Sequence, residues 1–513
     1  MKQKKMFMAA LCTLAFCLAG GRMCLSEALP EEVEAEAFAE GLEDKDFSGM
    51  DSAKEQEKAY DYSLFFLPEI DGFMQPYVGD TMPYYEDGTF YIYYLKEGGD
   101  SYNHSIYLTT TQDFLTYTEV EEPILVASDE GQDRWIGTGS VVKAGDIYYL
   151  FYTGHTSPSA EGYAEKVMVA KGTDLYSFEK VEGWEIVPDD SLGQRNDFRD
   201  PQGYVDAESG QIILTITASQ EGAARILKYT LSPDLSSITY DGIIFTDPTG
   251  EFWNLECSDT FQIGDTYYLT YSSQDDTLWY AAAKEPYGPY GEAKRLDGKL
   301  FYAAKHVEDE QGAYMVGWAR RSESVNSTKK VNGWAGNLAV QEVKQDEEGE
   351  LYLSPVSQIE ELFDQRRRLL IEEDSLTQKA EDGVIYQEVF QAYERFLLKG
   401  SFTYAGEGSF GLSFDLDGTQ EKYKTIEIDP SGQRLALLYN EGSTLIAETA
   451  VPLIEGEEYS FTYIQEGSVG IFFLDGKASL TVRLYGVSGR PISLFTRGCE
   501  ATFSNLREYT SLP

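Results

Sequence analysis

The sequence predicts an all-β protein: a five-bladed β-propeller followed by a C-terminal β-sandwich. Two observations carry this prediction. A turn-and-strand pattern recurs five times in the first two thirds of the chain, and short alternating runs between glycine turns fill the last quarter. Aromatic residues make up 14% of the chain, which favours half-buried strands. At 513 residues the chain is too long for one ordinary core, so we expect two folded domains.

The first 62 residues are interpreted as an export signal and a linker. In the signal, residues 1–28, three lysines among the first five residues precede an apolar run that is too short for a membrane span. Cys17 and Cys24 raise the possibility of a lipid anchor, but a bulky residue precedes each of them, so secretion is favoured over anchoring at the cell surface. Residues 29–62 are acidic and of low complexity, which predicts a solvated linker.

The propeller prediction, for residues 63–358, rests on a repeated unit. Each copy has a turn that runs into a strand crowded with aromatic and β-branched residues, and a second strand-like run follows. The copies are Asp87–Tyr94, Gly145–Tyr152, Gly210–Ile216, Gly264–Tyr271 and Gly312–Trp318. Repeats of roughly 50 residues with a hairpin in each are typical of propeller blades. An irregular β-sandwich in which similar turns coincide is the competing interpretation.

The chain changes character after the repeats. Residues 359–384 are charged and permit a helix, so they are predicted to be a connector, and the basic triplet Arg366–Arg368 is expected to dock on acidic neighbours. Residues 385–513 contain alternating runs such as Phe410–Leu416 and Val469–Leu474 between glycine turns. This pattern predicts an antiparallel β-sandwich.

The charge of the chain limits its partners. Forty-one basic residues against 87 acidic ones give a net charge of -46, which argues against binding to nucleic acid or an anionic membrane. A neutral oligo- or polysaccharide fits better, because aromatic rings stack on the apolar faces of sugars. The 3 histidines show no metal-ligand spacing, so neither a metal nor another cofactor is predicted.

The stretch from Asn196 to Tyr204 is predicted to be a stiff polar loop that carries chemistry. In it Arg199 stands beside Asp200, and Pro201 is expected to hold Asp200 in an extended conformation. A neighbouring guanidinium keeps a carboxylate ionised and leaves it able to accept hydrogen bonds from hydroxyl groups. A surface ion pair before a turn is the competing interpretation of these residues.

Two further acids are expected to join Asp200 in one pocket. Asp80 precedes the first repeated strand and Glu256 precedes the fourth, and corresponding loops of a propeller converge on one end of its channel. Trp253 and Leu255 flank Glu256 and are predicted to desolvate its carboxyl group. Two carboxyl groups across a glycosidic bond supply a nucleophile or base and a proton donor, while a third grips ring hydroxyls.

These motifs resemble those of glycoside hydrolase family 32, which includes invertases, levanases and inulinases. Arg199-Asp200-Pro201 is similar to the family's Arg-Asp-Pro motif, and Glu256-Cys257 is similar to its Glu-Cys motif. Further stretches that resemble the family are Asn103–Ser105 with Gln112–Tyr117, Trp135–Val142, Val316–Trp318 and Trp334–Leu338. The resemblance extends from about residue 65 to the end of the chain, because the family also carries a C-terminal β-sandwich.

The resemblance implies a role for each acid. Asp80 would be the nucleophile that forms a fructosyl-enzyme intermediate, Glu256 the acid and base, and Asp200 the group that stabilises the transition state. The expected substrate-binding residues are Arg199, Thr138, Trp135 and Cys257. The implied outcome is retention of configuration, for which the carboxyl groups of Asp80 and Glu256 should lie roughly 5 to 5.5 Å apart.

The sequence departs from the family at the nucleophile, where Asn-Asp-Pro-Asn-Gly is replaced by Gly79-Asp80-Thr81-Met82-Pro83. This run is somewhat similar to Asp-Ser-Trp-Pro in the related levansucrases, so transfer to a sugar acceptor stays open. The residues are also compatible with a non-catalytic carbohydrate-binding protein, or with an inverting furanosidase that acts on arabinan or xylan and needs a carboxylate gap of roughly 6.5 to 9.5 Å. We favour hydrolysis of β-fructofuranosidic bonds in fructans or sucrose.

Overall fold

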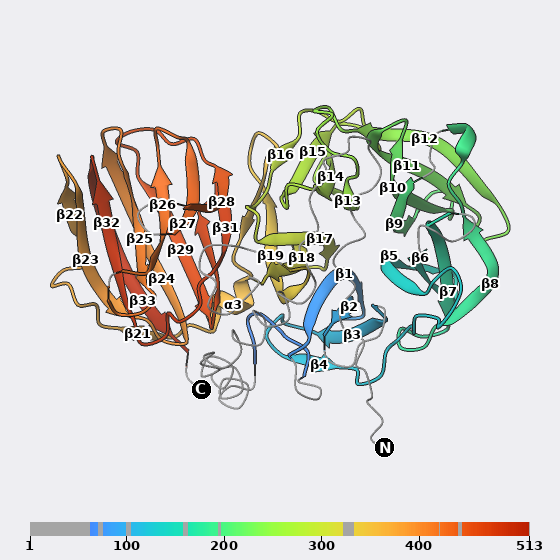
Figure 1. Ribbon diagram of the computed structural model, residues 1–513, viewed down its shortest axis with the longest axis horizontal. Coiled ribbons are helices and arrows are strands. Elements are labelled where there is room, and N and C mark those ends of the chain that lie inside the picture. Colours follow the sequence, from blue (N-terminus) through green and yellow to red (C-terminus); the bar gives the residue numbers. More distant parts are fainter. Residues whose placement is uncertain are drawn as a thin grey trace, which may run out of the picture. The chain divides into compact units, whose positions relative to one another are not determined.

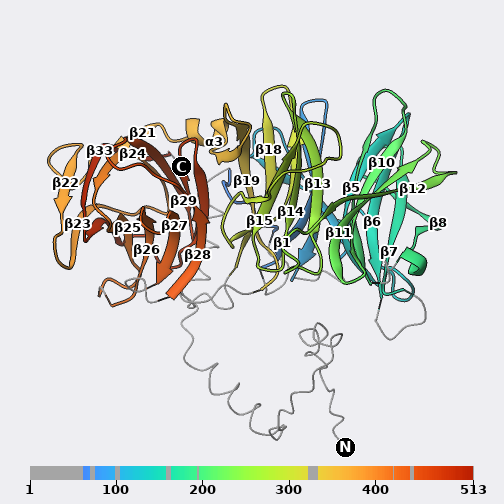
Figure 2. The same ribbon diagram turned by 90° about the horizontal axis from the view of Figure 1, so that it is seen from above.

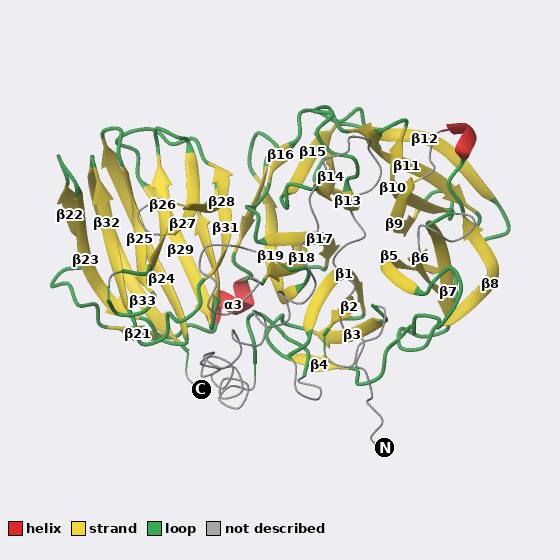
Figure 3. Cartoon of the chain, viewed as in Figure 1, coloured by secondary structure: helices red, strands yellow, loops and turns green. Residues whose placement is uncertain are grey.

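The computed structural model describes residues 62–69, 75–98, 104–156, 163–192, 196–321, 333–419, 421–439 and 444–511. In these residues the chain is a five-bladed β-propeller followed by a β-sandwich, which confirms the predicted fold class (Figure 1). Their only helical elements are α3 (Ser357–Glu361) and the 3-10 turn η1 (Asp190–Leu192), red in Figure 3, and no helix is long and apolar enough to cross a membrane. The predicted signal and all but the last residue of the predicted linker lie outside the described residues.

Each propeller blade is a small antiparallel sheet, and the blades follow one another along the chain. Blade 1 contains β1 (Tyr77–Glu86), β2 (Thr89–Glu97), β3 (Ile106–Thr111) and β4 (Tyr117–Glu119), and blade 2 contains β5 (Trp135–Ala144), β6 (Ile147–His155), β7 (Glu165–Gly172) and β8 (Glu179–Ile186). Blade 3 contains β9 (Asn196–Val205), β10 (Ile212–Gln220), β11 (Ala223–Leu231) and β12 (Ile238–Thr246). Blade 4 contains β13 (Glu256–Ile263), β14 (Thr266–Ser272), β15 (Leu278–Ala283) and β16 (Lys294–Arg295), and blade 5 contains β17 (Phe301–Glu308), β18 (Ala313–Arg320), β19 (Gly336–Gln345) and β20 (Leu351–Ser354). The aromatic strand of each sequence repeat is the second strand of a blade.

The first strands of the blades line the centre of the propeller. They contact one another in the circular order β1, β5, β9, β13, β17 and back to β1. β19 of blade 5 also pairs with β1 of blade 1, at Gly336 and Val78, so the strands of these two blades form one 8-stranded sheet. All five central strands therefore begin at one end of the channel and finish at the other.

The sandwich consists of two sheets that face each other (Figure 2). One sheet contains β21 (Gln365–Arg367), β22 (Leu376–Lys379), β24 (Arg395–Ala405), β29 (Tyr459–Glu466), β30 (Val469–Leu474), β31 (Ala478–Arg483) and β33 (Glu500–Thr510). The other contains β23 (Val384–Gln391), β25 (Ser409–Asp415), β26 (Tyr423–Asp429), β27 (Arg434–Tyr439), β28 (Thr444–Ala450) and β32 (Pro491–Arg497). Strands β21 and β22, which fall in the segment predicted to be a connector, pair with β33.

Arg483, at the end of β31, makes a buried polar link between the sandwich and blade 5. Its guanidinium donates hydrogen bonds to the carbonyl of Ala319 at 2.7 Å and to Asn337 Oδ1 at 2.9 Å. These bonds satisfy a cation that is only 4% exposed.

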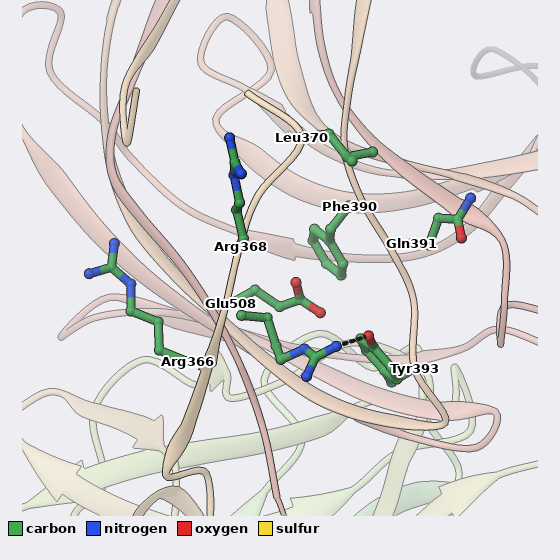
Figure 4. Close-up of a pocket in the computed structure, with 8 residues that line it drawn as sticks. Arg366, Arg368, Leu370, Phe390, Gln391, Tyr393 and Glu508 are labelled. Atoms are coloured by element: carbon green, nitrogen blue, oxygen red, sulfur yellow. Dashed lines mark hydrogen bonds between the residues drawn. The ribbon is translucent and has the colours of Figure 1, made fainter. Parts of the chain in front are cut away.

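The arginine triplet lines a hollow of about 440 Å³ on the sandwich (Figure 4). Arg366 forms an ion pair with Asp374 at 2.6 Å, as expected for a basic group docking on an acid. Arg367 donates a hydrogen bond to the Tyr393 hydroxyl and faces Glu508 across the β21–β33 pair. Burial raises the pKa of Glu508 to about 7.

Candidate active site

A β-bulge interrupts each of the five central strands near its start. The register shifts lie between Gly79 and Thr81 in β1, Gly137 and Gly139 in β5, Arg199 and Gln202 in β9, Glu256 and Asp259 in β13, and Tyr302 and Lys305 in β17. An extra residue bends a strand and re-aims its side chains. The bulges include four of the predicted site residues: Asp80, Thr138, Asp200 and Cys257. The same kind of bulge in successive blades therefore places these residues at one end of the channel.

The stretch predicted to be a polar loop is strand β9, and Asp200 in it is not extended. Asp200 has a φ of +57°, in the left-handed region, because it is the extra residue of the bulge. Asp tolerates this region better than most residues do. Pro201 disfavours mainly the right-handed helical conformation of its predecessor, so it does not prevent the bulge.

Asp200 lies at the floor of the site and is 4% exposed. Its Oδ2 atom accepts a hydrogen bond of 2.8 Å from the backbone N–H of Cys257 and lies 4.0 Å from Arg199 Nε. Burial raises the pKa of Asp200 to about 7, although the cation and the N–H both act to lower it.

Asp80 projects from the bulge of β1 and is held by the indole of Trp318. The indole N–H donates a hydrogen bond of 3.1 Å to Asp80 Oδ1. Burial raises the pKa of Asp80, the bond from Trp318 opposes this, and the charge of Glu256 adds to it. The two carboxyl groups are therefore electrostatically coupled in one site.

The replacement of Asn by Gly79 before Asp80 has a packing reason. A Cβ atom at this position would lie 2.0 Å from the indole of Trp334, so any side chain would displace that ring. Trp334 in turn stacks on His104, with ring centroids 4.5 Å apart. The departure from the family motif thus places an aromatic ring beside the first acid.

Glu256 is more open than Asp200, with a side chain that is 26% exposed against 5%. Its Oε1 atom accepts a hydrogen bond of 2.8 Å from Arg199 Nη2, and its Oε2 atom accepts one of 2.5 Å from the Tyr302 hydroxyl. Leu255 is buried, but Trp253 is 38% exposed and packs over the Arg199 guanidinium. The desolvation predicted at Glu256 therefore falls on Asp80 and Asp200 instead.

Arg199 is the electrostatic centre of the site. Besides Asp200 and Glu256, its guanidinium lies 3.2 Å from Glu165 and 3.1 Å from Asp197. The side chain is 12% exposed, so these ion pairs are weakly screened. A single cation thus lies within 4.0 Å of four acids.

The remaining predicted contact residues lie at different depths. Trp135 begins β5 and stacks on His155, with ring centroids 5.9 Å apart. Thr138 is 1% exposed, and its hydroxyl has no hydrogen-bond partner among the described residues. Cys257 is 2% exposed, and burial raises the pKa of its thiol well above the usual range. Thr138 and Cys257 therefore belong to the floor, where Cys257 supports Asp200 through its main chain.

Sequence reasoning missed four groups that contact the acids or their cation. Tyr302 is the second residue of the fifth central strand, and a search for the first strand of each repeat could have found it. Trp318 belongs to a stretch that resembles the family, but nothing in the sequence marks it as a partner of Asp80. Glu165 carries no motif, and Asp197 lies in the stretch from Asn196 to Tyr204 without being marked as a partner; the packing around Arg199 reveals both.

The geometry brings three carboxyl groups with unlike surroundings to one end of the channel. Asp80 and Asp200 are desolvated, whereas Glu256 is open and bound by two donors. Carboxyl groups in unlike environments can divide acid, base and nucleophile roles between them. Within the described part of the chain, no cluster of His, Cys, Asp and Glu is arranged to hold a metal ion.

Comparison with known proteins gives consistent matches. A sequence model described as "Glycosyl hydrolases family 32 N-terminal domain" matches residues 80–355, more than half of the chain. Sucrose-6-phosphate hydrolase of Escherichia coli is 26% identical over 401 residues, which cover 73% of this chain and 79% of that protein. Raffinose invertase of Escherichia coli is 23% identical over 480 residues, which cover 86% of this chain and 94% of that protein. The exo-inulinase of Aspergillus awamori has a similar fold, with a TM-score of 0.69 at 15% identity and coverage of 89% of this chain and 99% of that one.

Proposed function

The chain belongs to glycosyl hydrolase family 32 and is a glycoside hydrolase of the sucrose and fructan type, and from that premise we propose that it cleaves β-fructofuranosidic bonds with retention of configuration. The observation that carries this proposal is the meeting of Asp80, Asp200 and Glu256 at the bulged ends of central strands. Two coupled carboxyl groups can act as the nucleophile and the acid of a retaining glycosidase, and the third can accept hydrogen bonds from the hydroxyls of the sugar.

In the proposed reaction, Asp80 attacks the anomeric carbon of the fructosyl unit. A bond forms between its carboxylate oxygen and that carbon, the bond to the leaving oxygen breaks, and Glu256 gives that oxygen its proton. Water then attacks the same carbon, Glu256 takes the proton of the water, and the bond to Asp80 breaks. Two inversions give net retention.

The neighbouring groups support these steps. Trp318 orients the attacking carboxylate through its N–H, and Asp200 accepts hydrogen bonds from ring hydroxyls that strengthen as charge develops. Arg199 and Tyr302 hold both oxygens of Glu256 when no sugar is bound. The leaving oxygen of the substrate would replace one of these donors during proton transfer.

An unphosphorylated sugar fits the described site better than a phosphorylated one. The Arg199 charge is balanced by four carboxylates, and Arg321, near Trp334, is paired with Glu97 at 3.2 Å. A phosphate bound to either of these two arginines would have to compete with those acids, so we propose sucrose or a fructan as the substrate. The export signal predicted from the sequence supports a location outside the cell, and comparing activity in culture medium and cell extract checks this.

Release of reducing sugar from sucrose, inulin, levan, arabinan and sucrose 6-phosphate tests the substrate, with the Glu256→Gln variant beside the unaltered chain. Fructose release from sucrose or a fructan that the variant lacks would support the proposal. Release from arabinan alone, or a preference for sucrose 6-phosphate over sucrose, would contradict it.

Methanol as a competing acceptor tests the stereochemistry. The proton NMR spectrum of the methyl fructoside should show the β anomer, formed by retention. The α anomer would show inversion by a direct attack of methanol on the anomeric carbon, which would remove Asp80 from the nucleophile role.

A further inference from the structure

A second cavity, which we call the distal pocket, lies at the opposite ends of the same five central strands. It has a volume of about 610 Å³, within the usual range for ligand pockets. Each central strand contributes residues beyond its bulge: Pro83–Tyr85, Val141–Lys143, Gln202–Val205, Asp259–Gln262 and His306–Glu308. Asp80, Asp200 and Glu256 do not line it.

A buried cation separates the distal pocket from the active site. Lys305 is fully buried, and its ammonium group donates hydrogen bonds to the carbonyl of Gly139 at 2.6 Å and to Gln202 Oε1 at 3.0 Å. These bonds tie β5, β9 and β17 together across the channel. A ligand in the distal pocket would therefore not reach the three acids.

Aromatic rings line the distal pocket. Tyr204 and Tyr287 are half-buried and nearly parallel, with ring centroids 6.4 Å apart and an interplanar angle of 10°. Phe261 stacks on the imidazole of His306 at 4.1 Å and 5°. Such flat, partly accessible faces suit the C–H faces of sugar rings.

Two polar atoms of the pocket lining are buried without a hydrogen-bond partner among the described residues. They are His306 Nε2, on a side chain that is 11% exposed, and Thr260 Oγ1. Burial lowers the pKa of His306 to about 3, so its imidazole is neutral. Native proteins rarely leave such groups unsatisfied, and hydroxyl groups of a ligand can donate to them and accept from them.

Two charged groups around the distal pocket have a partner within the protein. Lys143 is paired with Glu86, and Asp259 accepts a hydrogen bond of 2.7 Å from the backbone N–H of His306. Glu308 is exposed and lies 3.9 Å from His306 Nε2. The pocket thus offers no free cation among its described residues, unlike the arginine-lined hollow of the sandwich, and favours an uncharged ligand.

We propose that the distal pocket is a non-catalytic binding site for a short stretch of a neutral polysaccharide. The stretch would stack on Tyr204 and Tyr287 while its hydroxyls bond to His306 and Thr260. The choice of polysaccharides to test rests on the proposed function, but the site itself does not. It would hold the enzyme on its polymer while the active site at the opposite end of the channel cleaves bonds.

Affinity electrophoresis in gels that contain inulin, levan, arabinan or xylan tests the proposal on the full chain. At least one polymer should retard the Asp80→Asn variant as strongly as the unaltered chain, because the distal pocket is intact in both. Tyr204→Ala and Tyr287→Ala should weaken this retardation about tenfold, equivalent to about 1.4 kcal/mol. Tyr176→Ala, which removes an exposed tyrosine elsewhere on the propeller, is the matched control.

Thr260→Val separates binding from folding, because it removes a hydroxyl that has no partner among the described residues and keeps the shape of the side chain. Retardation should weaken several-fold, with an unchanged melting temperature and unchanged kcat/KM on sucrose. The proposal is overturned if none of the four polymers retards the chain, or if the tyrosine and Thr260 variants are retarded as much as the control. Retardation without any release of fructose would support the distal site and contradict the proposed function alone.

Discussion

Arg199 Nη2 lies 2.8 Å from Glu256 Oε1, and this contact joins the third blade of the propeller to the fourth. The same guanidinium also faces Asp200, Glu165 and Asp197. The position of Glu256 is thus coupled to the charge of three other acids, and Arg199 is the residue through which changes in one should reach the others.

Replacing Arg199 with Lys should lower kcat/KM by about 100-fold, because a lysine keeps the charge but loses the planar fork that reaches several carboxylates at once. The acidic limb of the pH profile should also move to higher pH, because one ammonium group cannot stay close to every acid of the site, and the nearby charge of Arg199 lowers the pKa of Asp200. Arg434→Lys is the matched control: Arg434 lies within 3.8 Å of three carboxylates in the sandwich. A profile that moves in neither variant would contradict the coupling.

Asp200→Asn should abolish activity and yet stabilise the protein, more at pH 8 than at pH 5. The pKa of Asp200 in the folded protein is about 7, above the ordinary Asp value of 3.8, so the stability of the protein falls as the pH rises from about 4 to 7. Above about pH 7 the folded protein carries the full cost of burying an ionised carboxylate. Removing the charge should raise the free energy of unfolding by on the order of 4 kcal/mol at pH 8 and on the order of 2 kcal/mol at pH 5. Denaturant unfolding at the two pH values measures this. Equal changes at both would contradict a raised pKa.

Tyr302→Phe should lower kcat by about 10- to 100-fold and lower the stability by no more than the hydrogen bond that it removes. It removes one hydrogen bond to a charged group, which is worth roughly 1.5 to 3 kcal/mol, while the ring keeps its packing against Trp318. Tyr85→Phe loses a similar bond of 2.8 Å to Glu310, an exposed residue away from the acids, and should keep full activity. Equal kcat values for the two variants would show that Tyr302 does not act through Glu256.

The sequence predicted the fold class because the second strand of each blade is long, aromatic and preceded by a turn. It failed at the central strands, where bulges and polar residues remove the regular alternation that marks a strand. The segment around Asp200 therefore looked like a loop, although β9 runs through it. The functional strands of this propeller are the ones with the weakest strand signal.

The three acids could be found in the sequence because two of them carry motifs and the third precedes a repeat. The environments of the three acids could not be predicted from the sequence, because the side chains around each acid come partly from other blades. Trp253 is a neighbour of Glu256 in the sequence but covers Arg199, whereas Tyr302, 46 residues later, contacts Glu256 directly. Desolvation is a property of the folded site, and sequence neighbours predict it poorly.

Trp318→Phe should move the acidic limb of kcat/KM to higher pH. The indole N–H bonds to the ionised form of Asp80 and lowers its pKa, so losing that donor should raise the pKa and leave less of the nucleophile ionised at a given pH. At pH values well above the shifted limb most of the activity should return, because the carboxylate itself is intact. The pH dependence of kcat/KM on sucrose measures both effects.

Trp184→Phe is the control for Trp318→Phe, because it also removes an indole donor, one that bonds to the carbonyl of Leu235 at 3.2 Å in the outer part of the propeller. It should lower stability slightly and leave the pH profile unchanged. Since Trp318 is fully buried, its replacement by the smaller Phe will also cost stability, and melting temperatures separate that loss from catalysis. Reduced activity that is the same at every pH would assign Trp318 to packing and remove its role in setting the charge of Asp80.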